Sequence, residues 1–91
     1  MFAVVVRETG DAAQIDGSGG MVSANVAPRV REAPGFHSAL WMSDGAGETL
    51  NVLVFESEET ALGALESART SPRPPFMRVE SAEVFKVLAS A

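Results

Sequence analysis

The chain has 91 residues, 12 of them acidic and 7 basic, and it contains no cysteine. The absence of cysteine excludes disulfides and thiolate chemistry. Because the basic residues form no patch that could displace counterions from phosphates, nucleic-acid binding is excluded as well. A chain of this length makes one domain, residues 1–91, and buries only about 60–65% of its unfolded surface. With 46% hydrophobic and 21% charged residues, it has apolar surface that a partner could cover.

The first segment, Phe2–Arg7, is continuously apolar up to its arginine and is rich in β-branched residues. Continuous apolarity indicates a central strand that is covered on both faces. The apolar run Phe2–Val6 is too short for a signal peptide or a membrane span. We therefore expect a cytoplasmic protein that does not interact with a membrane.

The next segment, "GDAAQIDGSGG" at 10–20, is rich in turn residues. It lacks a phosphate-binding fingerprint, because position 22, where a third glycine would open a helix, is valine. This predicts a loop or a frayed helix start. A helical face follows at Val22, Val26, Val30 and Ala33, interrupted by Pro28, where we expect a kink or a restart.

Two strands, Phe36–Ser43 and Thr49–Glu56, flank the glycine-rich hairpin Asp44–Gly47. The second of these strands is apolar on both faces except at Asn51, so it too should be central. Ser57 is a good N-cap for a helix that ends near Arg69. The remaining segments are a stiff surface connection at Ser71–Pro75 and a last strand from Phe76 or Arg78 to Leu88.

The element order β-α-β-β-α-β predicts an α+β, ferredoxin-like fold. Its four-stranded antiparallel sheet has the spatial order 4-1-3-2, with both helices on one face. The helices cover only half of the apolar sheet surface, and an uncovered apolar patch of this size is unusual on a soluble monomer. We therefore predict a homodimer in which two sheets pair through their open faces as a dimeric α+β barrel.

The chain resembles the dimeric α+β barrel superfamily, in particular its antibiotic-biosynthesis-monooxygenase-like branch. The resemblance is carried by "APGF" at 33–36, by the glycine hairpin and by "VFESEETALGAL" at 54–65. It implies relatives that include cofactor-independent oxygenases of aromatic polyketides or quinols, haem-degrading enzymes and proteins of unassigned function. We accordingly expect no cofactor and a small apolar or aromatic ligand.

The haem-degrading members use an Asn on strand one, a Trp at the end of strand three and a His near helix two. This chain has no Asn in Phe2–Arg7, has Phe55 at the position of the Trp, and has no His after His37. These departures argue against haem cleavage. Phe55 is kept as a candidate for the wall of a ligand pocket.

Four polar or amphipathic residues complete the pocket candidates. Asn51 interrupts an apolar strand, and a buried amide needs either protein partners or a ligand. Alternation places Trp41 and His37 on one face of their strand and Phe36 on the other. Trp41 and His37 are about 13 Å apart along the strand, so they do not contact each other directly. Trp41 either packs at the barrel wall and dimer seam or contacts ligand. His37 either lies at the surface or in an interface, transfers a proton, or binds a metal.

Arg7 ends the first strand, either as a solvated terminus or as a group that binds an anionic substrate. Which face holds Trp41 depends on the hairpin register. A four-residue loop at 44–47 places Trp41 opposite Leu50, whereas a loop longer or shorter by one residue places it on the face of Asn51. A metal site is not expected, because no second histidine is present.

No catalytic residue follows from the sequence, and two functions remain. One is a cofactor-independent monooxygenase-like enzyme that acts on an aromatic polyketide- or quinol-type substrate, with Asn51, Trp41 and His37 positioning the substrate. The other is a non-catalytic dimeric ligand-binding or accessory protein. Cavity size separates them, since an interior filled by Leu, Val and Phe side chains leaves no room for a ring system.

Overall fold

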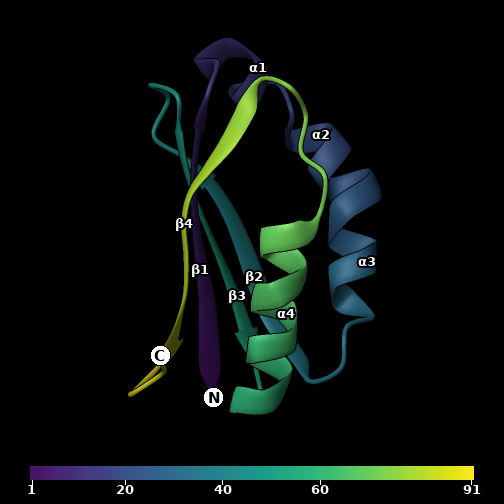
Figure 1. The fold of residues 1–91 in the computed structure, drawn as a ribbon, viewed down its shortest axis with the longest axis vertical. Helices are drawn as coiled ribbons and strands as arrows, with labels where there is room; N and C mark the ends of the chain where they lie inside the picture. Colours follow the sequence, from purple (N-terminus) through teal and green to yellow (C-terminus); the bar gives the residue numbers. More distant parts are fainter.

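The computed structural model describes all residues, 1–91. A four-stranded sheet carries a layer of helices on one side (Figure 1). The elements in chain order are β1 (Phe2–Gly10), α1 (Ala12–Asp16), α2 (Gly19–Met21), a π-helical turn η1 (Val22–Val26), α3 (Ala27–Arg31), β2 (Phe36–Ser43), β3 (Glu48–Phe55), α4 (Glu58–Thr70) and β4 (Met77–Lys86).

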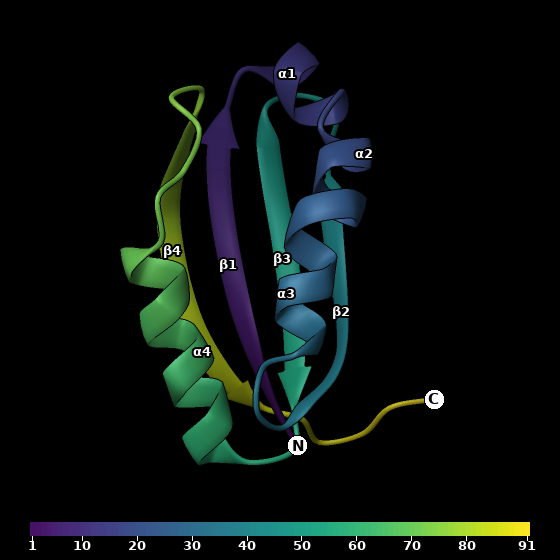
Figure 2. The same ribbon diagram turned by 90° about the vertical axis from the view of Figure 1, so that its right-hand side faces the viewer.

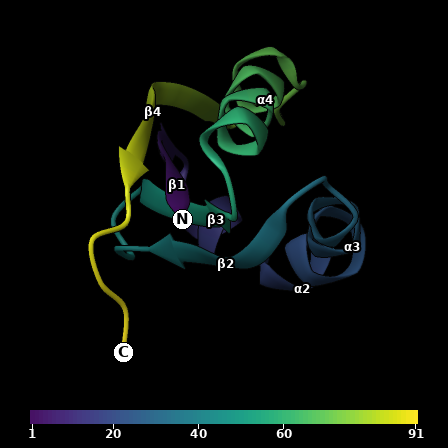
Figure 3. The same ribbon diagram turned by 90° about the horizontal axis from the view of Figure 1, so that it is seen from below.

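The sheet has the strand order β2-β3-β1-β4, and every neighbouring pair is antiparallel. This confirms the predicted α+β, ferredoxin-like topology, with β1 and β3 in the centre and β2 at an edge. Helices α3 and α4 lie side by side over the same sheet face, and the opposite face carries no helix (Figures 2 and 3).

The segment at 10–20, predicted as a loop or a frayed helix start, contains the short helix α1 and the start of α2. Asp11 accepts a hydrogen bond from the backbone N–H of Gln14 at 2.9 Å and so caps α1. Ile15 in this short helix is buried, which anchors the turn to the sheet. The bounds of α1 were not predicted, because a segment of five residues is too short to show a helical period.

The interruption predicted at Pro28 takes the form of a π-helical turn. Val22–Val26 bond with the wider π spacing, and α3 restarts at Ala27 with Pro28 in its first turn. Proline lacks the N–H that an α-helix would use here and is tolerated at a helix start. The helix therefore changes its hydrogen bonding immediately before the proline.

The β2–β3 register pairs Ser43 with Thr49 and Trp41 with Asn51. The connection is one residue longer than a four-residue loop, which resolves the open alternative and puts Trp41 on the face of Asn51. The predicted positive φ occurs at Gly45 and Gly47, with values of 76° and 97°.

The strict alternation expected along β2 is wrong at its start. A register shift between Phe36 and Ser38 places His37 in an irregularity, and Phe36 pairs with Phe55. The rings of Phe36 and Phe55 meet edge to face, with their centroids 6.1 Å apart. Phe36 therefore shares the helix-covered face with Trp41 instead of opposing it, because the irregularity resets the two-residue period.

The core lies between the sheet and α4. It consists of Val4, Val6, Phe55, Ala61, Leu65 and Ala82. Burying a Val, Leu or Phe side chain contributes roughly 1.5–3 kcal/mol each, so this small cluster fixes α4 firmly over β1 and β3. Helix α3 adds no residue to the fully buried cluster, and the space between the two helices stays open.

Candidate functional site

A cavity of about 1140 Å³ opens between the sheet and the helical layer. Its floor is the helix-covered face of β1 and β3, and its walls come from the segment α1 to α3 on one side and from α4 on the other. The apolar residues that line it include Ile15, Val22, Val26, Val30 and Ala68 in the walls and Leu53 in the floor. Ligand pockets usually measure about 300–1,000 Å³, so a fused ring system has room here.

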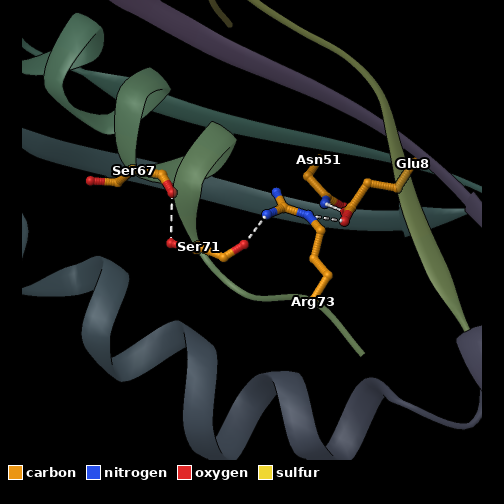
Figure 4. A network of polar contacts seen from close by, with 5 residues as sticks. All are labelled: Glu8, Asn51, Ser67, Ser71 and Arg73. Carbon is orange, nitrogen blue, oxygen red and sulfur yellow. Dashed lines mark hydrogen bonds and ion pairs between the residues drawn. The ribbon is translucent and has the colours of Figure 1, made fainter. Parts of the chain in front are cut away.

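A polar network forms one part of the cavity floor (Figure 4). Glu8 lies at its centre and is only 5% exposed. Asn51 donates from Nδ2 to Oε1 of Glu8 at 2.6 Å, and Arg73 donates from Nε to Oε2 at 2.7 Å. A buried charge is tolerated only when it is paired and hydrogen-bonded, and both conditions are met at Glu8.

Arg73 reaches Glu8 from the connection between α4 and β4. Its Nη1 donates to the carbonyl oxygen of Ser71 at 2.9 Å, and Ser71 Oγ donates to the carbonyl oxygen of Ser67 at 2.6 Å. These bonds tie the connection to the last turn of α4 and aim the guanidinium inward (Figure 4). The segment expected to be a surface connection thus supplies a half-buried charge.

Thr49 lies beside this network and completes its polar surface. It faces Glu8 directly in the β1–β3 register and lines the cavity. Its Oγ1 is buried and has no hydrogen-bond partner within the chain. Buried hydroxyls are usually paired, so this atom has hydrogen-bonding capacity that the chain itself does not use.

Three of the five sequence candidates line the cavity: Asn51, Trp41 and Phe55. Asn51 and Trp41 are cross-strand partners, whereas Phe55 is almost fully buried and belongs mainly to the core. The amide of Asn51 finds a protein partner in Glu8, which was the first of the two predicted alternatives.

The other two candidates, His37 and Arg7, lie outside the cavity. His37 is exposed, and its Nδ1 lies 3.0 Å from Ser38 Oγ. Arg7 is exposed on the opposite sheet face and forms an ion pair with Glu48. His37 thus occupies a surface position, the first of its predicted alternatives, and the irregularity in β2 breaks the alternation that placed it on the face of Trp41.

Three residues of the site, Glu8, Thr49 and Arg73, were not among the sequence candidates. A signal for Glu8 was present, since Val4, Val6 and Glu8 continue one two-residue period along β1, but the strand was expected to end at Arg7. Thr49 carried no signal, because its missing partner is visible only in three dimensions. Arg73 was hidden by the prolines around it.

Solved structures with the same fold were found for this chain. The first is a monooxygenase from the ActVA-Orf6 gene of Streptomyces coelicolor, in complex with nanaomycin D, at 22% identity, a TM-score of 0.64, and coverage of 99% of this chain and 89% of that one. The second is SnoaB, a cofactor-independent oxygenase from Streptomyces nogalater, at 22% identity, a TM-score of 0.62 and coverage of 98% and 94%.

The third is the haem-degrader MhuD from Mycobacterium tuberculosis, with two haems bound in its active site, at 22% identity, a TM-score of 0.61 and coverage of 100% and 99%. This chain has the ferredoxin-like fold of these proteins. The similarity confirms the fold implied by the antibiotic-biosynthesis-monooxygenase-like resemblance. No protein-family model matches the chain, and no curated protein is significantly similar to it.

Two further properties bear on the site. The chain contains no group of three or more His, Cys, Asp or Glu side chains that could hold a metal ion. None of its helices combines the length and the apolarity needed to cross a membrane.

Proposed function

We propose that the cavity binds a polycyclic phenol or quinol and that the protein acts on it as a cofactor-independent monooxygenase. The observation that carries the proposal is the cavity itself, which is large enough for fused rings and combines apolar side chains of the sheet and the helices with a polar group at Glu8 and Asn51. A few convergent polar groups in an apolar pocket are typical of ligand sites. Two structural neighbours, a monooxygenase in complex with nanaomycin D and a cofactor-independent oxygenase, support the same function.

For a phenol that carries hydrogen at the para carbon, the reaction balances without a cofactor. The substrate loses its hydroxyl proton, and the electron pair of the resulting anion goes to molecular oxygen at the ring carbon para to that hydroxyl. The ring C–H proton and the O–O bond are then lost with release of water, which leaves a quinone. For 1-naphthol, one molecule of oxygen gives 1,4-naphthoquinone and one water.

The chain's own residues would position the substrate and exclude water. The apolar walls would replace solvent around the rings, and Trp41 lines the cavity beside Asn51. Correct placement of a substrate can account for a large part of the rate of such a reaction.

The alternative of a non-catalytic ligand-binding protein shares the first step, which is occupation of the cavity. The observed cavity argues against a protein with a filled interior, but it does not distinguish an enzyme from a protein that only binds a ligand. The similarity to MhuD extends to the fold, whereas the Asn, Trp and His pattern expected for haem cleavage is absent from this sequence.

Oxygen uptake tests the enzymatic proposal. With naphthols, naphthoquinols and anthrones, we expect uptake above that of buffer, and a loss of about 100-fold in Asn51→Ala, the scale expected for a misplaced substrate. Asn25→Ala is the matched control, because Asn25 is exposed and lies outside the cavity. Uptake equal to that of buffer, or an unchanged rate in Asn51→Ala, would remove the enzymatic function.

We also propose that the protein is a homodimer through the open sheet face. Leu40, Met42 and Phe85 on this face are 62%, 39% and 52% exposed in the single chain, and Val5, Val52 and Val54 lie between them. A second copy covers such a surface with its own equivalent face. The cytoplasmic location expected from the sequence is kept as part of this proposal.

A further inference from the structure

We propose that Glu8 and Thr49 form a hydroxyl-recognition site that selects the phenol or quinol form of a ligand over the quinone. The inference rests on the proposed function in one respect, since it takes the cavity to be the ligand site. It adds which chemical group the cavity recognises and how substrate is distinguished from product.

The two side chains are placed together by the sheet. Glu8 and Thr49 are directly opposed in the β1–β3 register, and both line the cavity. Opposed residues of antiparallel strands have Cβ atoms about 4.5–5.5 Å apart on the same face. One oxygen atom of a ligand can therefore contact both side chains.

Glu8 supplies an acceptor. An ionised carboxylate only accepts hydrogen bonds, and its two oxygens together offer about four positions. In the structure each oxygen receives one bond, from Asn51 and from Arg73, so acceptor capacity remains on both. The carboxylate is almost wholly removed from solvent, so water competes weakly for that capacity.

Thr49 supplies the second contact. Its Oγ1 is the one buried side-chain polar atom of the chain that has no partner. A threonine hydroxyl can donate as well as accept. A ligand hydroxyl that donates to Glu8 would have its oxygen free to accept from Thr49, and both groups would then be satisfied.

This arrangement discriminates between the two oxidation states of a ligand. A phenol donates its proton to the carboxylate, whereas a quinone oxygen has no proton to donate and meets a negative charge. Sites built to hydrogen-bond a substrate hydroxyl can discriminate strongly against analogues that lack it. In the proposed reaction the hydroxyl-bearing substrate is held and the quinone product is released.

The experiment compares 1-naphthol with 1,4-naphthoquinone by calorimetric titration under nitrogen, so that no turnover occurs. We expect the wild-type protein to bind the naphthol at least 10-fold more tightly. In Glu8→Gln the preference should fall to about twofold or reverse, because the amide can donate to the quinone oxygen. Glu66→Gln, an exposed glutamate of α4 outside the cavity, should behave like the wild type.

Thr49→Val tests the site independently if Glu8→Gln does not fold. Valine keeps the β-branched shape, and the lost hydroxyl makes no bond within the chain. We expect an unfolding midpoint no lower than that of the wild type, together with naphthol affinity reduced about 5- to 10-fold. Lowered stability with unchanged affinity would mean that the hydroxyl serves the fold, and this would overturn the inference.

Retention of the naphthol preference in Glu8→Gln, or no binding of either probe by the wild type, would also overturn the inference. A different result would contradict the enzymatic proposal alone. A wild-type protein that prefers naphthol through Glu8 but takes up no oxygen retains the recognition site and loses the oxygenase function. Oxygen uptake by a wild-type protein that binds naphthol and naphthoquinone equally well would retain the oxygenase function and exclude the recognition site.

Discussion

Asp44 closes the β2–β3 hairpin through its carboxylate. Its Oδ1 accepts from the backbone N–H groups of Ala46 at 2.8 Å and of Glu48 at 3.1 Å. These bonds lower the pKa of Asp44 below its ordinary value of 3.8, and the bond from Ala46 has the larger effect. The hydrogen bonds of this turn therefore favour the ionised form of the Asp44 side chain.

We predict an acid-dependent difference between the wild type and Asp44→Asn. A group whose pKa is lower in the folded state contributes its full stability above its unfolded pKa and loses that contribution as the pH falls toward the folded pKa. The wild type should have the higher melting temperature at pH 5 to 6, and the gap should narrow below about pH 4. Thermal unfolding followed by circular dichroism between pH 2.5 and 6 measures this gap.

Because the other carboxylates are common to both proteins, their titration cancels in the difference. A gap that stays constant from pH 6 to pH 2.5 would contradict the role given to the charge of Asp44. The amide side chain of Asp44→Asn keeps an acceptor oxygen at every pH. A difference in melting temperature that came from hydrogen bonding alone would therefore not change with pH.

At the residue level, the one polar residue of the cavity that the sequence predicted is the one that interrupts an apolar strand. Asn51 was recognised because it interrupts an apolar strand, and it does line the cavity. Glu8 was not recognised, because a charged residue after Arg7 looks like the end of a strand, and its partner Arg73 is 65 positions away. Pairing across such a separation is decided by the tertiary fold and leaves no local signal.

At the level of elements, α4 has the best-defined start. Ser57 accepts at Oγ from the backbone N–H of Thr60 at 3.2 Å, and Glu58 and Glu59 occupy the first turn. A serine cap satisfies a free N–H, and acidic residues suit the positive end of the helix. Since α4 carries Ala61 and Leu65 of the core, its start influences the stability of the whole sheet.

We predict that Ser57→Ala lowers the free energy of unfolding by about 1 kcal/mol, the usual value of such a cap. Urea unfolding at neutral pH measures it. Ser67→Ala, in the same helix but exposed, is the control and should be neutral or slightly stabilising, because alanine favours the helix interior. Equal losses in the two variants would show that capping does not stabilise α4.

The elements that were predicted well are those with a long period or a strong boundary. The bounds of β2 and α4 agree closely with expectation, since the hairpin glycines and Ser57 mark them in the sequence. The irregularity at His37 and the π-helical turn before Pro28 were not specified by any period. Both are local changes of spacing. The irregularity in β2 leaves His37 outside the cavity, whereas the predicted helical face of Val22, Val26, Val30 and Ala33 still lines it.

At the level of the whole molecule, the two faces of the sheet have different tasks. The face under α3 and α4 carries the cavity and the Glu8 network, whereas the opposite face presents apolar side chains to solvent. This division followed from the sequence, because β1 and β3 are apolar on both sides. Helices on one side cannot cover both faces (Figure 3).

The proposed dimer can be tested with two leucines of similar exposure. Leu40 on the open face and Leu62 on α4 are 62% and 48% exposed, so an aspartate at either position should leave the fold of the single chain intact. Only Leu40→Asp would place a charge between two sheets, and twofold symmetry would place it there twice.

Sedimentation velocity across a micromolar concentration series should then show a dimer for the wild type and for Leu62→Asp, and a monomer for Leu40→Asp. Covering one leucine contributes roughly 1.5–3 kcal/mol, and burying an unpaired carboxylate costs more. The dissociation constant should therefore rise at least 100-fold in Leu40→Asp. A wild-type protein that sediments as a monomer throughout the series would show that the open face is exposed to solvent, and the barrel would be excluded.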